Sequence, residues 1–360
     1  MEKSLIEDNE KLINEFGAKK VSALKDVPDF YTFKRQLIYS HRDFDKFYEA
    51  LKKGEKCAIV SGLNASGTLH LGHKIVFDTN LYFQKKFGIP VFVPISDDES
   101  YVAGKVENQE EAYKNSIKLA KELLAYGFDP KKTYFIIDQV YTNIYNLAIK
   151  LSRKVNLSEI KATYGYANEE NIGLHFYPAV QSAHILFPQE VLGIKNVLVP
   201  IGPDEDAHIR ICRDIASRIG FNKPAIIHSR FFPGLDGNKM SKSRANGIFL
   251  NEPMNEIEKK IKKGAFSGGQ ATVEEHRKLG GDPDVDVSCI YLTNLFLDEK
   301  QGNKIKEDYR KGKMLSAEMK ELFIKEIKGF IENFQKNLSK VSDAELKKTI
   351  LKNGAFNYYT

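Results

Sequence analysis

Two histidines and a group of small residues form the first candidate site for chemistry. His70 and His73 are three residues apart, and Ser66, Gly67 and Gly72 surround them. Residues at this spacing share one face of a helix, so both imidazoles are expected to point the same way. Glycines let the backbone approach a ligand closely, and N–H groups at a helix start bind anions. The stretch predicts a phosphate site, with two unrelated histidines or a pair of metal ligands as alternatives.

A second candidate site is a glycine-flanked loop with two lysines and two hydroxyl groups. It consists of Gly237, Asn238, Lys239, Met240, Ser241, Lys242 and Ser243. Ammonium groups on a mobile loop can close over a pyrophosphate leaving group and open again for product release. Taken alone, the loop is equally compatible with an ordinary basic surface. Together and in this order, the two stretches favour a site for a nucleoside triphosphate.

Short apolar runs alternate with helical patterns between these two stretches. The expected strands are 58–60, 91–95, 134–137, 196–199 and 225–227, and the expected helices include 70–86 and 108–126. Apolar runs of this length are typical of parallel strands that are buried on both faces and joined by helical crossovers. The pattern predicts a doubly wound, Rossmann-like α/β sheet, whose ligands bind at the carboxyl ends of the strands.

The periodicity changes twice along the chain and divides it into three parts. Residues 1–55 are predicted to be a mainly helical appended segment, and residues 56–250 the α/β domain. Beyond residue 250 strand patterns stop, and apolar residues between 313 and 336 recur with helical spacing. Residues 251–360 are therefore predicted to form a separate helical domain.

Composition and charge exclude several classes of protein. Apolar residues make up 42% of the 360 and no run of 18 occurs, so a globular protein without a membrane span is expected. The charged N-terminus argues against secretion, and three scattered cysteines argue against a structural zinc site. Residues 300–360 hold 14 Lys or Arg against 8 Asp or Glu, an excess of six that equals the net charge. This excess suits a polyanion such as RNA, although a solvated lysine-rich surface is the simpler reading.

The two candidate stretches resemble the HIGH and KMSKS signatures of class I aminoacyl-tRNA synthetases. They read His70-Leu71-Gly72-His73 and Lys239-Met240-Ser241-Lys242-Ser243. Gly202-Pro203-Asp204-Glu205-Asp206 is similar to the family element whose aspartate, here Asp204, holds the ATP ribose. The resemblance implies ATP as a substrate with Mg²⁺, no prosthetic group and no protein-bound metal. It places ATP against Ser66, Gly67, Gly72, Asp204, Met240, Ser241 and Ser243, with His70, His73, Lys239 and Lys242 on its phosphates.

Further stretches resemble the tryptophan-specific branch of archaeal and eukaryotic type. They are 176–183, 204–216, 265–269, 274–277 and 280–287, and the likeness covers roughly residues 30–340. It implies attachment of tryptophan to tRNA(Trp) through an adenylate, in the cytoplasm and without a membrane. It also implies an anticodon-binding role for the helical domain. A homodimer joined through an insertion near residues 100–190 is expected as well.

The same resemblance implies a set of residues for the amino acid. Glu99 is expected to bind the substrate ammonium group and Gln181 its polar end, and Gly62 and Glu205 are expected to line the same site. An ammonium group in a closed pocket requires a carboxylate partner, because an unpaired buried charge is costly.

This chain differs from its better-known eukaryotic relatives at the positions that are expected to contact the indole ring. Val60 and Pro94 stand where those members have a tyrosine and a glutamine, and neither side chain accepts a hydrogen bond. Glu205 replaces a further glutamine. The acceptor for the indole N–H therefore stays open, with Asp97, Asn64, a backbone carbonyl or water as options.

Three other functions are compatible with parts of this pattern. A tyrosine-specific synthetase shares the fold and both signatures. A different adenylyl-transferring enzyme uses the histidine element but needs neither the lysine loop nor a helical RNA-binding domain. A non-catalytic RNA-binding descendant is expected to lose the histidines and lysines, and both sets are intact here.

Overall fold

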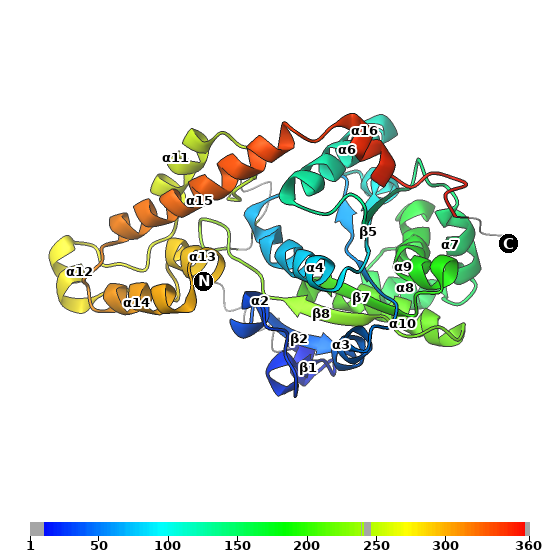
Figure 1. Ribbon diagram of the computed structural model, residues 1–360, viewed down its shortest axis with the longest axis horizontal. Helices are drawn as coiled ribbons and strands as arrows, with labels where there is room; N and C mark the ends of the chain where they lie inside the picture. The colour runs from blue at the N-terminus through cyan, green and yellow to red at the C-terminus, as the bar shows by residue number, and fades with distance from the viewer. Residues whose placement is uncertain (1–10, 239, 241–245, 357–360) are drawn as a thin grey trace. The chain divides into compact units, whose positions relative to one another are not determined.

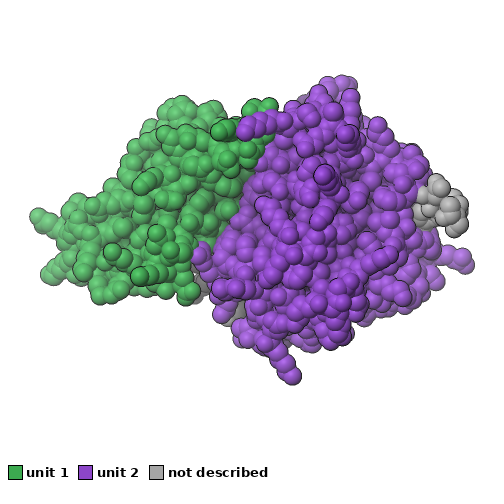
Figure 2. Space-filling view, viewed as in Figure 1, with its two compact units in different colours: residues 1–11, 68–75, 230–339 green, residues 12–67, 76–229, 340–360 purple. Residues whose placement is uncertain are grey.

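The computed structural model describes residues 11–238, 240 and 246–356. The chain forms two compact units, coloured separately in Figure 2. We call residues 12–67, 76–229 and 340–360 the sheet unit, and residues 1–11, 68–75 and 230–339 the helical unit. Each is described by itself below.

Five parallel strands form the centre of the sheet unit (Figure 1). They are β3 (Cys57–Val60), β5 (Val91–Ser96), β6 (Thr133–Ile137), β7 (Asn196–Ile201) and β8 (Ala225–Ser229). Their spatial order is β6-β5-β3-β7-β8. The chain therefore adds β5 and β6 on one side of β3 and then returns to add β7 and β8 on the other side. This is the Rossmann-type order, and the predicted doubly wound sheet is confirmed.

Burial explains why these segments become strands. All four residues of β3 and all six of β5 are buried, so both faces of the sheet are covered. Helices connect the strands: α4 (Lys74–Phe87), α6 (Gln109–Tyr126), α7 (Ile144–Ser152), α8 (Leu157–Tyr164), α9 (Ile172–Leu192) and α10 (Asp206–Arg218). In α8, a capping box of Asn156 and Glu159 fixes the start, and Gly165 at φ 72° ends the helix.

The change of direction between β3 and β7 creates a ligand-binding position. Segments that leave neighbouring strands to opposite sides open a crevice beyond their carboxyl ends. In the sheet unit, residues 61–67 follow β3 and residues 202–206 follow β7. Both segments contain predicted site residues, as the resemblance required.

The leading segment contributes strands that the sequence did not predict. It contains β1 (Lys19–Lys20), α2 (Tyr31–Lys34), β2 (Ile38–Arg42) and α3 (Phe44–Lys52). β2 pairs antiparallel with β8 and so extends the sheet. Its polar residues Ser40 and His41 are buried, so the strand lacks an apolar run by which it might be recognised. Residues 38–42 thus belong to the sheet rather than to an appended helical segment.

Helices make up most of the second unit. They are α11 (Met254–Gly264), α12 (Val273–Leu279), α13 (Val287–Leu295), α14 (Glu299–Arg310) and α15 (Ser316–Leu338). Met319, Phe323, Ile327 and Ile331 form a fully buried stripe on α15, in agreement with the predicted apolar face. Among the described residues, no helix is both long and apolar enough to cross a membrane.

The unit boundaries differ from those expected at residues 55 and 250. The helical unit also takes in residues 68–75 and 230–250, and it ends at residue 339. The helix α16 (Asp343–Thr349) and the residues after it return to the sheet unit, where the Leu351 N–H donates to the Phe135 carbonyl at 2.9 Å. The last residues of the predicted helical domain at 251–360 therefore belong to the sheet unit.

Candidate active site

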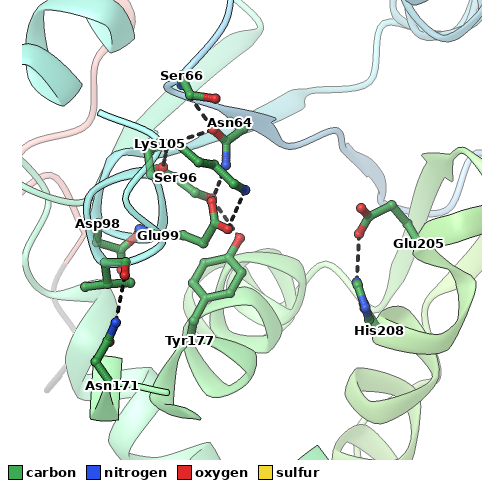
Figure 3. Close-up of polar contacts among 12 residues, drawn as sticks. Asn64, Ser66, Ser96, Asp98, Glu99, Lys105, Asn171, Tyr177, Glu205 and His208 are labelled. Atoms are coloured by element: carbon green, nitrogen blue, oxygen red, sulfur yellow. Dashed lines mark hydrogen bonds and ion pairs between the residues drawn. The ribbon is translucent and has the colours of Figure 1, made fainter. Parts of the chain in front are cut away.

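Glu99 is the central carboxylate of the sheet-unit site (Figure 3). It lies on α5 (Asp97–Val102), directly after β5, and it is 9% exposed. One of its oxygens, Oε1, is 2.6 Å from the Lys105 ammonium nitrogen. The other, Oε2, accepts a hydrogen bond from the amide of Asn64. A buried carboxylate with a cation on it is chemically suited to bind an ammonium group.

Asn64 fixes the position of Glu99. It lies on the short strand β4 (Leu63–Asn64), which pairs with the end of β5. Its Oδ1 accepts from the Ser66 backbone N–H at 3.1 Å and from the Ser100 hydroxyl at 2.9 Å. Because the Asn64 side-chain oxygen already accepts these two hydrogen bonds, the amide presents its N–H groups to Glu99. Asn64 is thus a positioning residue for the carboxylate.

A second polar group joins four helical elements of the sheet unit. The Tyr164 hydroxyl donates to Gln181 Oε1 at 2.6 Å. His208 Nδ1 is 3.1 Å from Glu205 Oε2, and the His208 ring stacks on Tyr164 at 4.0 Å with 3° between the planes. Burial raises the pKa of Glu205, but the hydrogen bond and charge of His208, the charge of Lys105 and a hydrogen bond from Gln181 outweigh it and lower the pKa overall. Glu205 therefore stays ionised at neutral pH and makes the site more attractive to a cation.

The two positions that the resemblance places beside the indole carry apolar side chains. Val60 and Pro94 are buried. Asp97 already accepts from the backbone N–H groups of Asp138 and Gln139 at 2.8 and 3.3 Å. The hydroxyl of Tyr177, which lies 3.0 Å from Ser96 Oγ, is a further polar group that the sequence reasoning missed.

The remaining sheet-unit predictions lie in the two strand-end segments. Gly62 is exposed between β3 and β4, and Gly67 ends the segment that follows β4. Asp204 is exposed in the short 3-10 helix η3 (Pro203–Glu205), beyond the end of β7. These places agree with residues that reach a ligand at the carboxyl ends of the strands.

The two predicted imidazoles lie together in the helical unit. His70 precedes the 3-10 helix η2 (Leu71–His73), and the ring centroids of His70 and His73 are 3.8 Å apart. The His70 backbone N–H and carbonyl oxygen lie 3.1 and 3.2 Å from His73 Nδ1, so this nitrogen has a partner in either tautomer of the neutral ring. Burial, together with the neighbouring His70, lowers the pKa of His73 well below its usual value. His73 is thus neutral at physiological pH, and a neutral imidazole carries one N–H that can donate.

The described residues that follow the lysine-bearing loop contact the histidine segment. The Leu71 N–H donates to the Ile248 carbonyl and the Leu250 N–H to the Leu69 carbonyl, both at 2.9 Å. A Cβ atom at Gly72 would lie 3.0 Å from the His70 ring and 3.5 Å from the Met240 methyl group. A side chain at Gly72 would therefore push the His70 ring away by a few tenths of an ångström. Lys239, Ser241, Lys242 and Ser243 lie outside the described residues, whereas Met240 lies near Gly72 and residues 248 and 250 are hydrogen-bonded to the histidine segment.

The contact of Met240 and residues 248–250 with the histidine segment agrees with the comparison against known families. The family of class I tRNA synthetases (W and Y) matches residues 52–332. The chain belongs to this family.

Individual members of the family match this synthetase over almost its whole length. A protein of Sulfolobus acidocaldarius named tryptophan–tRNA ligase is 37% identical and covers 93% of this chain and 90% of its own. The crystal structure of tryptophanyl-tRNA synthetase from Aeropyrum pernix superposes with a TM-score of 0.88 at 32% identity, covering 97% and 98% of the two chains. The tryptophan-bound enzyme of Encephalitozoon cuniculi gives a TM-score of 0.84 at 31% identity, with 96% and 98% covered.

A buried ion pair supports the strand-end segment of this synthetase. Arg42, on β2, holds both carboxylate oxygens of Asp206 at 2.7 and 2.8 Å. His228 Nε2 lies 3.0 Å from the same carboxylate, and Ser40 lies 2.9 Å from the other nitrogen of that ring. Asp206 directly follows Asp204 and Glu205, so the pair fixes the segment that carries both. No sequence motif indicated this pairing, because its partners are 164 residues apart.

Replacing Arg42 by methionine is expected to destabilise the fold by about 3 kcal/mol, because it leaves a buried carboxylate without its main cation. Burial raises the pKa of Asp206, but hydrogen bonds from His228 and Arg42 outweigh it and lower the pKa overall. The ion pair therefore stabilises the fold fully above the pKa that Asp206 has in the unfolded chain, about 4, and this stabilisation is lost as the pH falls below that value. Urea unfolding at pH 7 and at acidic pH measures both effects.

Arg218→Met is the matched control for this measurement. Arg218 pairs with Glu159 in the same unit, but both side chains are more than a third exposed. Exposed pairs contribute less than about 1 kcal/mol. Equal losses in the free energy of unfolding for the two variants would contradict a special role for the Arg42–Asp206 pair.

Proposed function

We propose that this chain attaches tryptophan to tRNA(Trp) at the expense of ATP. The tryptophan carboxylate attacks the α-phosphorus in line, and pyrophosphate leaves. A 3′-ribose hydroxyl of the tRNA then attacks the acyl carbon of the adenylate, so that the ester forms and AMP leaves. The observation that carries the proposal is the contact between the histidine segment and the residues around the lysine loop. The names of the relatives that match along the whole chain support tryptophan as the substrate.

Each group in the site has a role in this reaction. Glu99 pairs with the substrate ammonium group, and Gln181 holds its polar end beside Glu205. Asp204 binds the ribose of ATP, which enters as its Mg²⁺ complex. His70, His73, Lys239 and Lys242 donate to the phosphates as negative charge builds up. The reaction needs no protein nucleophile, so positioning and charge stabilisation supply the catalysis.

The remaining assignments follow from the family and the charge distribution. The helical region after residue 250 reads the anticodon, with basic residues beyond position 300 on the RNA phosphates. The protein acts as a homodimer, joined through residues near 100–190. It works in the cytoplasm, as the name of the Schizosaccharomyces pombe relative, 33% identical, states for that protein.

Exchange of pyrophosphate into ATP, driven by single amino acids, tests this function. Tryptophan is expected to support exchange at least about 100-fold better than tyrosine, the scale on which an apolar pocket discriminates between side chains of different size. Charging of tRNA(Trp) transcripts is the second readout. Faster exchange with tyrosine would make the enzyme a tyrosyl-tRNA synthetase, and absence of exchange with both would refute the activity.

A further inference from the structure

An ammonium group already occupies the carboxylate that the proposed function assigns to the substrate. Lys105 Nζ lies 2.6 Å from Glu99 Oε1. Lys105 follows α5 in the turn that leads to α6 and belongs to the same unit as Glu99. A lysine side chain ends in a primary ammonium group, the same chemical group by which an amino acid is recognised. Lys105 therefore stands where the α-ammonium of the substrate is expected to bind.

The two donors on Glu99 differ in how easily they can leave. Asn64 holds Oε2 and is itself fixed by Ser66 and Ser100, so its removal would break several hydrogen bonds. The Lys105 side chain is 45% exposed, whereas that of Glu99 is 11% exposed. Exposed ion pairs are weak, because water can replace the partner at little cost. Lys105 is thus the donor that an incoming ligand can displace.

Two ammonium groups on one carboxylate oxygen would repel each other at close range. From the contact, the exposure and the shared chemistry, we infer that Lys105 is a built-in competitor of the substrate ammonium group and must leave Glu99 when an amino acid binds. The inference rests on the proposed function, since it assumes that Glu99 receives that ammonium group. Glu205, whose charge also interacts with Lys105, offers a second carboxylate nearby.

The competition lowers the apparent affinity for every ligand that carries an ammonium group. Such a ligand binds only the fraction of molecules in which Glu99 is available, so its apparent Kd rises by the inverse of that fraction. A ligand without an ammonium group does not use Glu99 and escapes this penalty. The opposite role, in which Lys105 binds the substrate carboxylate, predicts the reverse dependence.

Lys105→Met tests the competition in the full-length enzyme. The variant is expected to lower the KM for tryptophan in pyrophosphate exchange about three- to tenfold, because the resident cation is gone. Inhibition constants of two probes separate the explanations. Tryptamine, which keeps the ammonium group, should bind three- to tenfold tighter to the variant, whereas indole-3-propionate, which keeps only the carboxylate, should bind equally to both enzymes.

Two further variants complete the experiment. Lys105→Arg keeps a cation on Glu99 and should leave tryptamine binding no tighter than in the parent enzyme. Lys114→Met removes an exposed lysine that pairs with Glu110 on α6, and it should change neither inhibition constant. An unchanged tryptamine constant in Lys105→Met, or weaker binding of indole-3-propionate, would overturn the inference. Loss of tryptophan-dependent exchange in the parent enzyme would instead refute the proposed function.

Discussion

Replacing Lys242 by alanine is expected to slow formation of the adenylate by about 100-fold or more. The enzyme must stabilise charge that builds up on the leaving pyrophosphate, and removal of one such donor typically has an effect of this size. Lys242 itself lies outside the described residues. Met240 and Phe249, on either side of it, are held beside Gly72 and His70. In the proposed function, Lys242 acts on the phosphates together with these histidines.

Pyrophosphate exchange and a single-turnover measurement of adenylate formation check this prediction. The loss should appear in the rate more than in the KM for tryptophan, because the interaction strengthens in the transition state. Lys259→Ala is the control, since Lys259 is an exposed lysine of the helical unit that pairs with Glu256. A change of less than twofold in the rate of adenylate formation for Lys242→Ala would show that Lys242 has no role in this step.

Replacing Glu99 by glutamine is expected to raise the KM for tryptophan by about 100-fold. The substitution keeps the shape of the side chain but removes the charge, and a charge-assisted hydrogen bond contributes about 3 kcal/mol. The KM for ATP should change by less than about threefold, because Glu99 is assigned to the amino acid alone. Steady-state exchange assays with each substrate varied in turn measure both constants.

Glu110→Gln provides the matched control for Glu99→Gln. Glu110 is an exposed carboxylate whose partner is a lysine of the same helix, so its neutralisation should have no effect on tryptophan. Coupling to Lys105 gives a second check. In the Glu99→Gln background, Lys105→Met should no longer lower the KM, since residues in contact show non-additive effects. A tryptophan KM within threefold of the parent value would place the substrate ammonium elsewhere.

Much of the catalytic core was predictable because its signals are local. Each parallel strand is a short buried apolar run, and each signature is a continuous stretch of sequence. The strand β2 escaped prediction because Ser40 and His41 are polar, and their burial depends on partners such as His228. The contact of Lys105 with Glu99 was missed for a related reason. A lysine in a turn carries no signal until the fold places a carboxylate next to it.

The last described segment has a consequence for how the sheet ends. Of the described strands, β6 has β5 as its sheet partner, so its other edge would offer unpaired backbone groups. Ile350 forms a parallel bridge with Phe135, and Leu351 donates to the same strand. Exposed strand edges recruit strands from other molecules and promote aggregation. Residues 350 and 351 pair with the backbone of Phe135, so this part of the edge is not open to a strand from another molecule.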